Sequence, residues 1–438
     1  MPTLGSWGRY PRYPQTAHPV AWPFEAEGAL SRARSHGAET TLGYGCGRSY
    51  GDSCLAESDH VIAMAGMDRV IEADWRTGVV LVQAGMTLNG LIRLALPHGW
   101  FLPVTPGTKF VTLGGAVAND VHGKNHHVMG TFGRHVRRIM LYRSDTGVCE
   151  CSPSINQELF RATVGGLGLT GIVLAVEVQL RAVRSSDIEQ TSIKFGNLDE
   201  FFALSAQYDS KFEYTVSWVD CLAGGTSAGR GHYIGGNHAA EGELRVAGGN
   251  AKRMPVDPPF SLVNPLTLKL FNTLYYQRQQ RKVIDTRVSY DPFFYPLDKL
   301  LQWNRIYGKA GFQQYQCVIP PDAGRDAVAA ILFETARNGA GSFLAVLKQC
   351  ADIKSPGLLS FPKAGVSLAL DFAQHDALNT RLFARLDAVV HEAGGRLYPA
   401  KDAHMSAHHF QAAYPAWAQL ESLRDPLLMS RFWRRVTS

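Results

Sequence analysis

The stretch GYGCGRSYGD, residues 43–52, opens a series of glycine clusters. The later clusters are PGT (106–108), GG (114–115), GTFG (130–133) and GGLGLTG (165–171). Each glycine costs backbone entropy, so such a dense series needs a reason, for example a close approach of the backbone to a ligand. Several separate loops whose N–H groups converge can hold a pyrophosphate. We therefore expect a large phosphate-bearing cofactor in this part of the chain.

The first cluster lacks the context of a nicotinamide-dinucleotide motif. That motif needs a strand before its glycines, a helix directly after them and an acidic residue further along the chain. Residues 45–52 do not open a recognisable Rossmann helix, so we reject NAD. Glycine turns that hold no ligand are the alternative, and their concentration in one predicted domain argues against it.

Hydrophobic patterns predict strands and helices on both sides of about residue 184. VVLVQAG (79–85) is typical of a buried strand, and Thr87 is placed to cap a helix that ends before Gly99. Further along, 212–220 and 312–320 are typical of strands, whereas 323–339 and 380–394 are amphipathic and predict helices. The sequence therefore predicts a second domain with an antiparallel sheet covered by helices.

Composition excludes several classes of protein. Of the 438 residues, 45% are hydrophobic and only 19% are charged, which is typical of a globular chain. The net charge of +6 favours an anionic ligand, but the aromatic residues do not interleave with Arg/Lys runs, so we expect no nucleic-acid partner. Seven scattered cysteines without CxxC pairs predict neither a disulfide framework nor a zinc site, and we expect no metal. No signal peptide or spanning segment is recognisable.

Longer strings of sequence resemble a known family. They are GCGRSYGD (45–52), LPVTPGTKFVTLGGAVANDVHGKNHHVMGTFGRHV (102–136), ATVGGLGLTGI (162–172), WNRIYGKAGFQQYQCVIP (303–320) and GGRLYPAKD (394–402). Together they resemble the decaprenylphosphoryl-ribose oxidases of the vanillyl-alcohol-oxidase superfamily, over most of the chain. The resemblance implies an α+β, two-domain PCMH-type FAD-binding fold.

The resemblance also implies a division of the chain and an activity. Residues 1–183, completed by 396–438, would form the FAD-binding domain, and 184–395 the substrate domain. The reaction would be oxidation of the ribose 2′-hydroxyl of a polyprenyl-phosphoryl ribofuranose to the 2′-keto sugar. A short-chain reductase partner would then produce the arabinose epimer, a donor for cell-envelope glycans. We expect peripheral contact with the bacterial inner membrane, on a side that the sequence leaves undecided.

The family's FAD contacts can be carried over residue by residue. They fall on Gly45, Gly47, Arg48, Ser49, Tyr50, Gly51, Asp52, Gly107, Thr108, Gly114, Gly115, Asn119, His122, Gly123, Asn125, Ile172 and Tyr398. Many members of the superfamily bind flavin covalently through a histidine at the position matched here to Asp52. Since this position is an aspartate, we expect non-covalent FAD.

The family's substrate contacts can be carried over in the same way, and these residues would line the substrate side of the flavin. They are Lys124, Trp218, Phe294, Arg305, Gln314, Gln316, Lys348, Ser367 and Lys401, together with His122 and Tyr398. Three positions depart from the mycobacterial enzyme, which has cysteine at Ala369, asparagine at Ser367 and tyrosine at Phe294. These changes put the fine shape of the substrate in doubt.

We expect Lys401, His122 and Tyr50 to be the catalytic residues. Oxidation of an alcohol by flavin needs positive charge near the pyrimidine edge of the ring, and we expect Lys401 to provide it and to orient substrate, ahead of acting as a base. His122 lies in DVHGKNHH, whose spacing fits no familiar zinc pattern; it would bond flavin or substrate phosphate, or be a structural imidazole.

Other residues keep two interpretations. Gln314 and Gln316 alternate on one strand and so share a face, which suits either sugar recognition or an exposed polar surface. Arg305 and Lys348 are suited to bind phosphate, and are equally typical of surface cations. Residues 258–283 are apolar with a basic end, which is typical of a lipid-surface element or of a core helix.

Two alternative functions stay open. The same fold can oxidise a free sugar, an alditol or an aldonolactone. A membrane-surface scaffold that binds FAD only for stability is a third hypothesis, and the combination of Lys401, His122 and both glutamines argues against it.

Overall fold

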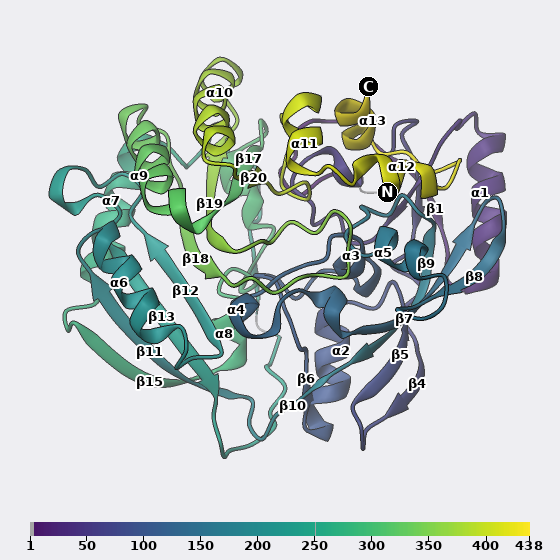
Figure 1. Ribbon diagram of the computed structural model, residues 1–438, viewed down its shortest axis with the longest axis horizontal. Coiled ribbons are helices and arrows are strands. Elements are labelled where there is room, and N and C mark those ends of the chain that lie inside the picture. Colours follow the sequence, from purple (N-terminus) through teal and green to yellow (C-terminus); the bar gives the residue numbers. More distant parts are fainter. Residues whose placement is uncertain (1–3, 250) are drawn as a thin grey trace.

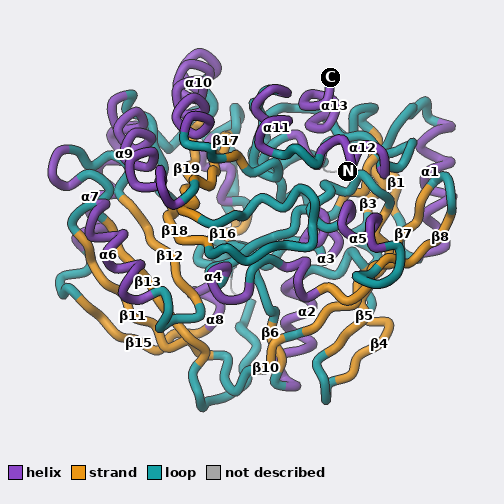
Figure 2. The backbone as a smooth tube through the Cα atoms, viewed as in Figure 1, coloured by secondary structure: helices purple, strands orange, loops and turns teal. Residues whose placement is uncertain are grey.

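The computed structural model of the protein describes residues 4–249 and 251–438. Two large sheets, one of five strands and one of eight, form the two sides of the molecule (Figure 1). Loops fill much of the space between them (Figure 2). Antiparallel sheets covered by helices confirm the expected α+β fold.

The first side contains a small parallel sheet and a larger antiparallel one. The small sheet has the order β1-β3-β2, with α1 against β1 and β3. The larger sheet has the order β4-β5-β9-β7-β8. The bounds are β1 Thr16–Pro19, β2 Leu42–Tyr44, β3 His60–Ala63, β4 Val70–Asp74, β5 Val79–Gln83, β7 Val136–Arg143, β8 Gly147–Cys151, β9 Ile172–Gln179 and α1 Ala26–Ser35.

The predicted strand and capped helix of this side are confirmed. β5 covers most of the predicted strand and buries Val80 and Val82. Helix α2, Leu88–Ala95, begins after Thr87, whose hydroxyl accepts a hydrogen bond from Gly90 N at 3.0 Å. The chain leaves this helix through Gly99, which has a φ of +83° and so adopts the left-handed conformation that glycine tolerates.

The second side is an eight-stranded antiparallel sheet in the order β15-β11-β13-β12-β18-β19-β17-β20. Helices α6, α9 and α10 lie along one of its faces (Figure 1). β12 and β17 confirm the two predicted strands, and α9 and α10 the two predicted helices. The bounds are β11 Asp187–Phe195, β12 Tyr214–Val219, β13 Gly231–His238, β15 Val283–Ser289, β17 Phe312–Ile319, β18 Val346–Cys350, β19 Gly365–Ala373, β20 Arg396–Leu397, α6 Leu198–Tyr208, α9 Pro321–Arg337 and α10 Asp376–Glu392.

Shorter elements connect the two sides. Two pairs of two-residue strands, β6 with β10 and β14 with β16, lie outside the larger sheets. Helix α3 follows a glycine loop, and α7 and α8 flank β15. The bounds are β6 Trp100–Phe101, β10 Arg181–Ala182, β14 Lys252–Arg253, β16 Leu300–Leu301, α3 Leu113–Ala118, α4 His126–Met129, α5 Gln157–Thr163, α7 Pro265–Gln277 and α8 Tyr290–Phe294.

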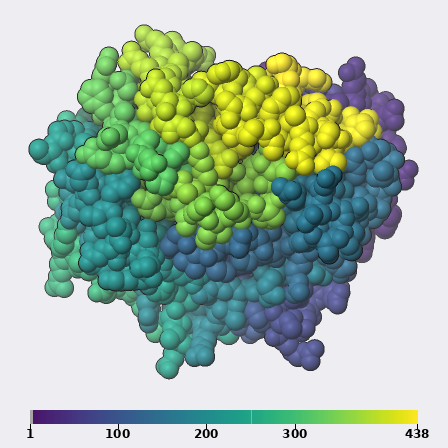
Figure 3. Space-filling model, viewed as in Figure 1, coloured from purple at the N-terminus to yellow at the C-terminus, as the bar shows by residue number. Residues whose placement is uncertain are grey.

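The C-terminal segment contacts both sides. β20 pairs with β17 in the large sheet, whereas Leu428 and Ser430 bridge to Thr41 and Ala56 beside the first glycine loop. Figure 3 shows the last residues, in yellow, lying across the top between segments of the two sides. The helices here are α11 Ala407–Ala413, α12 Trp417–Leu423 and α13 Arg431–Thr437. The division into domains stays a prediction, because one hydrophobic core includes residues of both.

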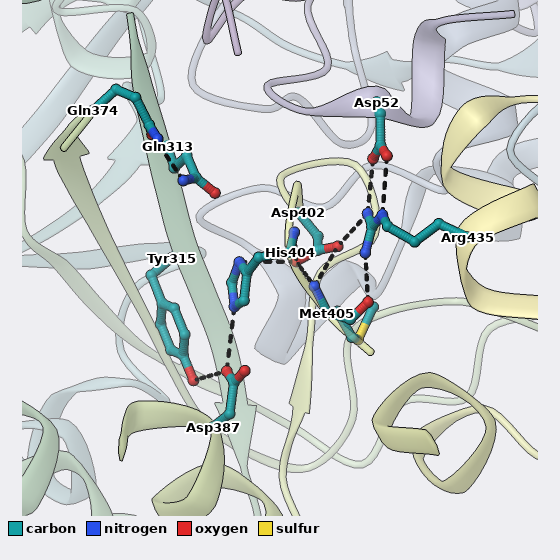
Figure 4. Close-up of polar contacts among 9 residues, drawn as sticks. All are labelled: Asp52, Gln313, Tyr315, Gln374, Asp387, Asp402, His404, Met405 and Arg435. Carbon is teal, nitrogen blue, oxygen red and sulfur yellow. Dashed lines mark hydrogen bonds and ion pairs between the residues drawn. The ribbon is translucent and has the colours of Figure 1, made fainter. Parts of the chain in front are cut away.

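A buried polar network centres on Arg435 of α13 (Figure 4). Its guanidinium binds Asp52 of the first glycine loop through two nitrogens, at 2.8 and 3.0 Å, and Asp402 at 2.9 Å. Asp402 also faces His404, whose ring lies 3.3 Å from Asp387 of α10. The network therefore connects the first loop, the segment after β20 and a helix of the large sheet.

Removing Arg435 should destabilise the fold. Arg435→Met leaves the carboxylates of Asp52 and Asp402 buried without their main partner, since their side chains are only 6% and 1% exposed. The free energy of unfolding in urea should fall by about 3 kcal/mol. Arg434→Met is the matched control, because its ion pair with Glu57 is largely exposed and should contribute less than about 1 kcal/mol. Equal losses in the two variants would contradict the role of the network.

Candidate active site

A cavity of about 440 Å³ lies between the glycine loops and the large sheet. The loops before α3, the first glycine loop and the loop before β9 contribute backbone and small side chains to its wall. Strands β12, β17, β18 and β19 contribute polar side chains. The cavity therefore combines a region of exposed backbone with a region of polar side chains.

The glycine side of the cavity fits a phosphate-bearing cofactor. A Cβ atom added at Gly43 or Gly107 would meet nothing within 4 Å, so these backbones face open space. The buried Nε of Arg48 and hydroxyl of Ser53 have no hydrogen-bond partner among the described residues. Buried polar atoms are normally paired, so these donors are expected to bind a ligand. Gly47 has a φ of +60°, which favours glycine in this loop.

The sheet side presents side chains from neighbouring strands at matched positions. Gln314 and Gln316 of β17 pair with Asp371 and Ala369 of β19 and share one face. The next strand, β18, places Lys348 opposite Ser367. Because side chains alternate along a strand, the intervening Tyr315 points to the other face, where its hydroxyl donates to Asp387 at 2.9 Å. One face of the sheet thus presents polar side chains to the cavity, and polar side chains on the opposite face bond to other parts of the protein.

Two lysines form a cationic region at one end of the cavity. Lys348 Nζ donates to the Gly123 carbonyl at 2.9 Å, and Lys124 Nζ donates to the Phe293 carbonyl. Burial lowers the pKa of Lys124 to about 7, and the charge of Lys348 adds to this effect. Burial likewise lowers the pKa of Lys348 to about 8. An anionic ligand between them would restore both charges.

His122 lies between the two regions. Its Nε2 is 3.3 Å from the Gln316 amide nitrogen, and its ring contacts Phe361 and Tyr398 at centroid distances of 5.4 and 5.3 Å. Burial, and then the charge of Lys348, holds the pKa of His122 well below its usual value. The imidazole is therefore neutral near pH 7. Its Nδ1 has no partner within the described part of the chain.

Lys401, Tyr50 and Asp371 form a second group of polar side chains on the cavity wall. Lys401 Nζ lies 3.6 Å from the centroid of the Tyr50 ring, a cation–π distance. Burial lowers the pKa of Lys401 to about 7, opposed by the charge of Asp371. Burial raises the pKa of Asp371 to about 7, opposed by its hydrogen bond from Gln314 and by Lys401. Burial thus brings the pKa values of Lys401 and Asp371 close to each other.

Sequence reasoning missed Asp371. It is the only charged residue in the buried strand GVSLALDFA, and a lone carboxylate in an apolar strand is itself a signal of function.

Most of the expected site residues line the cavity. Those on its wall are Gly45, Gly47, Arg48, Ser49, Tyr50, Gly107, Thr108, Gly114, Gly115, Asn119, His122, Gly123, Lys124, Ile172, Trp218, Phe294, Gln314, Gln316, Lys348, Ser367, Tyr398 and Lys401. Their individual roles stay predictions, but the structure brings them together.

Four expected residues do not line the cavity. Gly51 packs against Asp402, since an added Cβ would lie 1.7 Å from the Asp402 carbonyl oxygen. Asp52 binds Arg435, and the Asn125 amide donates to the Pro103 carbonyl at 2.8 Å. Each of these three residues contacts a neighbouring segment of the protein and does not face the cavity. Asp52 therefore does not face the cavity, its assignment as an FAD contact stays a prediction, and the cation of that loop on the wall is Arg48.

Arg305 is the fourth, and its suggested contact with the substrate phosphate stays a prediction. Its Nε donates to Asp257 at 3.0 Å, and its Nη1 donates to the carbonyls of Met254 and Pro255, both at 3.1 Å. These contacts hold the loop before α7. The cations on the cavity wall are instead Arg48, Lys124, Lys348 and Lys401.

Comparison with known proteins agrees with this geometry. Residues 25–152 match the family model described as FAD binding domain. The chain is 34% identical to decaprenylphosphoryl-beta-D-ribose oxidase of Mycolicibacterium smegmatis, over 97% of this chain and 94% of that protein. This chain belongs to the decaprenylphosphoryl-β-D-ribose oxidase family. It is also 33% identical to "Uncharacterized protein in mprA 5'region" of Streptomyces coelicolor, over 77% of this chain and 95% of that protein.

Membership of the family defines the class of chemistry. The chain is an FAD-dependent oxidoreductase that acts on CH–OH groups. The similarity to L-gulonolactone oxidase of Mus musculus, 31% identity, covers only 35% of this chain and 34% of that protein. The glycine loops have no histidine between residues 43 and 54. Non-covalent attachment of FAD stays a prediction.

Filling the open space at Gly107 should prevent FAD binding without unfolding the protein. Gly107→Val places two methyl groups where no protein atom lies within 4 Å of the added Cβ. The purified variant should have a strongly reduced ratio of flavin to protein absorbance, with an unchanged far-ultraviolet circular dichroism spectrum. Gly224→Ala is the matched control, because Gly224 also faces open space but does not line the cavity. Full FAD content in Gly107→Val would contradict this assignment of the cofactor site.

Proposed function

We propose that this oxidoreductase converts the 2′-hydroxyl of a polyprenyl-phosphoryl-β-D-ribofuranose to the 2′-keto sugar. The observation that carries the proposal is a single cavity with a glycine-loop wall, a polar strand face and two buried lysines at one end. The relative from Mycolicibacterium smegmatis, which matches almost the full chain, is a decaprenylphosphoryl-beta-D-ribose oxidase. The keto sugar would be the first product of an epimerisation to the arabinose donor.

The side chains of the cavity have separable tasks in this reaction. When bound, FAD supplies a hydride acceptor for the alcohol carbon. Lys401 in its protonated form provides positive charge beside the reacting hydroxyl, which stabilises negative charge that develops there. Gln316, next to His122, is suited to bind sugar hydroxyls through its amide. These groups orient the sugar and exclude water.

Lys124 and Lys348 are suited to bind the substrate phosphate. A phosphodiester keeps its negative charge across the neutral pH range, so the pH dependence of its binding depends on the two lysines. They have lowered pKa values of about 7 and about 8, so both are charged at low pH and lose charge as pH rises. A free sugar has no group that would use these cations.

An anaerobic titration tests the substrate. Polyprenyl-phosphoryl ribose of short chain length should bleach the flavin absorbance of the holoenzyme, whereas free ribose and xylitol should not. Bleaching only by a free polyol would instead favour the alternative, oxidation of a free sugar, alditol or aldonolactone. Bleaching by none of them would favour a scaffold that binds FAD for stability.

The KM for the lipid phosphate should depend on pH through the two lysines. We expect the lowest KM below about pH 7 and a rise as pH increases through 8, because the lysines then lose their protons. Lys348→Arg should reduce this rise, since guanidinium keeps its charge over the whole range. Lys348→Met should raise KM at all pH values. A flat KM profile for the wild type would exclude this phosphate site.

We also propose peripheral contact with the bacterial inner membrane through α7. Leu266, Leu270 and Leu274 of this helix are 78%, 60% and 61% exposed, and their spacing places them on one face. Basic residues follow at Arg278, Arg281 and Lys282, as in helices that lie on anionic lipid. An ordinary core helix would bury this stripe. Within the described residues, no helix is long and apolar enough to cross a membrane.

The position of α7 supports delivery of a lipid substrate. Tyr275 of the helix lies on the cavity wall, 4.6 Å from the Trp218 ring between centroids. A prenyl chain held in the bilayer beside α7 would thus be close to the cavity. The ketone product also needs a hydride donor to become the arabinose epimer, so we propose a short-chain reductase as partner.

Removing the apolar stripe of α7 should abolish vesicle binding. The triple variant Leu266→Ser/Leu270→Ser/Leu274→Ser should bind phosphatidylglycerol-containing vesicles at least about 100-fold more weakly in co-sedimentation, because three leucines no longer enter the lipid. Activity on a water-soluble short-chain substrate should be kept. Phe333→Ser is the control, since Phe333 is 62% exposed on α9. Equal vesicle binding by the triple variant and the wild type would exclude α7 as the contact.

A further inference from the structure

Asp371 differs from the other acidic residue of the cavity wall. Asp298 uses both carboxylate oxygens, accepting from Thr108 Oγ1 at 2.8 Å and from the Lys109 amide at 2.9 Å. Asp371 Oδ1 accepts from Gln314 Nε2 at 2.6 Å, whereas Oδ2 has no hydrogen-bond partner among the residues described. The side chain is fully buried in the protein and still lines the cavity. Its second oxygen is therefore a buried acceptor without a donor, in a side chain that lies on the cavity wall.

A buried carboxylate oxygen without a donor is costly. The titratable or charged groups around Asp371 are Lys401, Tyr50 and Tyr307, from three different segments of the chain. Within residues 4–249 and 251–438, none of the three forms a hydrogen bond with this carboxylate. A hydroxyl group of the substrate would supply the missing donor.

We propose that Asp371 accepts the proton of the substrate hydroxyl during oxidation. The inference deepens the proposed function, because it assigns the acceptor that the alcohol needs at the same site. The O–H bond breaks and its proton moves to Oδ2 of Asp371. The electron pair of that bond forms the second C–O bond of the ketone, and the C–H hydrogen leaves as hydride, for which bound FAD is the oxidant. Atoms and electrons then balance.

The neighbours of Asp371 are arranged for this role. Gln314 donates to Oδ1 and so directs the other oxygen, Oδ2, as the free acceptor. Burial raises the pKa of the carboxyl to about 7, which makes it a stronger base than an ordinary aspartate at neutral pH. Lys401 in its protonated form lowers the cost of the carboxylate form. Lys401 is then a charge stabiliser, as the sequence suggested, and Asp371 is the base.

The pH dependence of flavin reduction distinguishes the role of Asp371 from that of Lys401. In stopped-flow reduction of the holoenzyme, the wild-type rate should rise as pH approaches about 7 and Asp371 loses its proton, and should fall at higher pH as Lys401 loses its charge. Asp371→Asn should lose this rise and be slower by about 100-fold or more. Lys401→Met should keep the rise but at higher pH, because the nearby positive charge is gone. A lost rise in Lys401→Met together with a kept rise in Asp371→Asn would overturn the proposal.

Two further variants control for the possibility that Asp371→Asn simply misfolds. Asp371→Glu keeps a carboxylate and should recover part of the rate and the pH-dependent rise. Asp387→Asn removes a carboxylate that binds Tyr315 on the other face of the same strands, so the rise should be kept. Both variants and Asp371→Asn should retain wild-type FAD content. A pH-dependent rise lost from Asp387→Asn but present in Asp371→Asn would contradict the proposal.

Infrared difference spectroscopy locates the proton without measuring turnover. Holoenzyme labelled with [4-¹³C]aspartate is reduced anaerobically by substrate, and an isotope-shifted band of a protonated carboxyl should appear. The band should be absent from Asp371→Asn. Absence of the band from reduced wild type, or its presence in Asp371→Asn, would overturn the inference.

The choice of substrate keeps this test separate from the proposed function. Both experiments use polyprenyl-phosphoryl ribose if it bleaches the wild-type flavin, and otherwise the polyol that does. Failure of the lipid phosphate to reduce the wild type would refute the proposed substrate, while the comparison with Asp371→Asn still decides the role of Asp371.

Discussion

The ion pairs of Arg435 are the interaction on which the geometry of the site depends. This guanidinium holds Asp52, which follows the glycines of the first loop, and Asp402, which follows Lys401 in the sequence. Gly51 allows the first loop to contact the Asp402 carbonyl directly. Residues 45–50 and Lys401 come from distant parts of the chain, and Arg435 as a common partner fixes their separation. Loss of this partner would release the cofactor wall and the reactive end of the cavity together.

Burial of charge determines the chemistry of the cavity. In water a lysine is charged and an aspartate is ionised at neutral pH, with pKa values far apart. Inside the cavity, desolvation lowers the pKa of Lys401 and raises that of Asp371 until both are about 7. Proton exchange near neutral pH then costs little free energy. At the other end, Lys124 and Lys348 repel each other across a buried space and are therefore suited to an anion.

The fold was largely predictable because its local signals agree with the tertiary structure. The alternating and amphipathic patterns that predict β12, β17, α9 and α10 are strong, and Thr87 caps its helix as expected. The site residues expected from the family motifs mostly line the cavity. Arg305, Asp52, Gly51 and Asn125 do not, because adjacent positions in a motif include residues that support the loop as well as residues that face the ligand.

The sequence by itself determined the α+β fold, the glycine loops of an FAD site and the family, because glycine spacing, hydrophobic period and long motifs are local properties of the chain. Only the tertiary structure decided which cations face the cavity, that the α7 leucines are exposed, and that Asp371 lies beside Lys401. Asp371 and Lys401 lie on separate segments, so their proximity requires the folded sheet and the C-terminal segment. Their pKa values follow from desolvation, which depends on every segment that surrounds them.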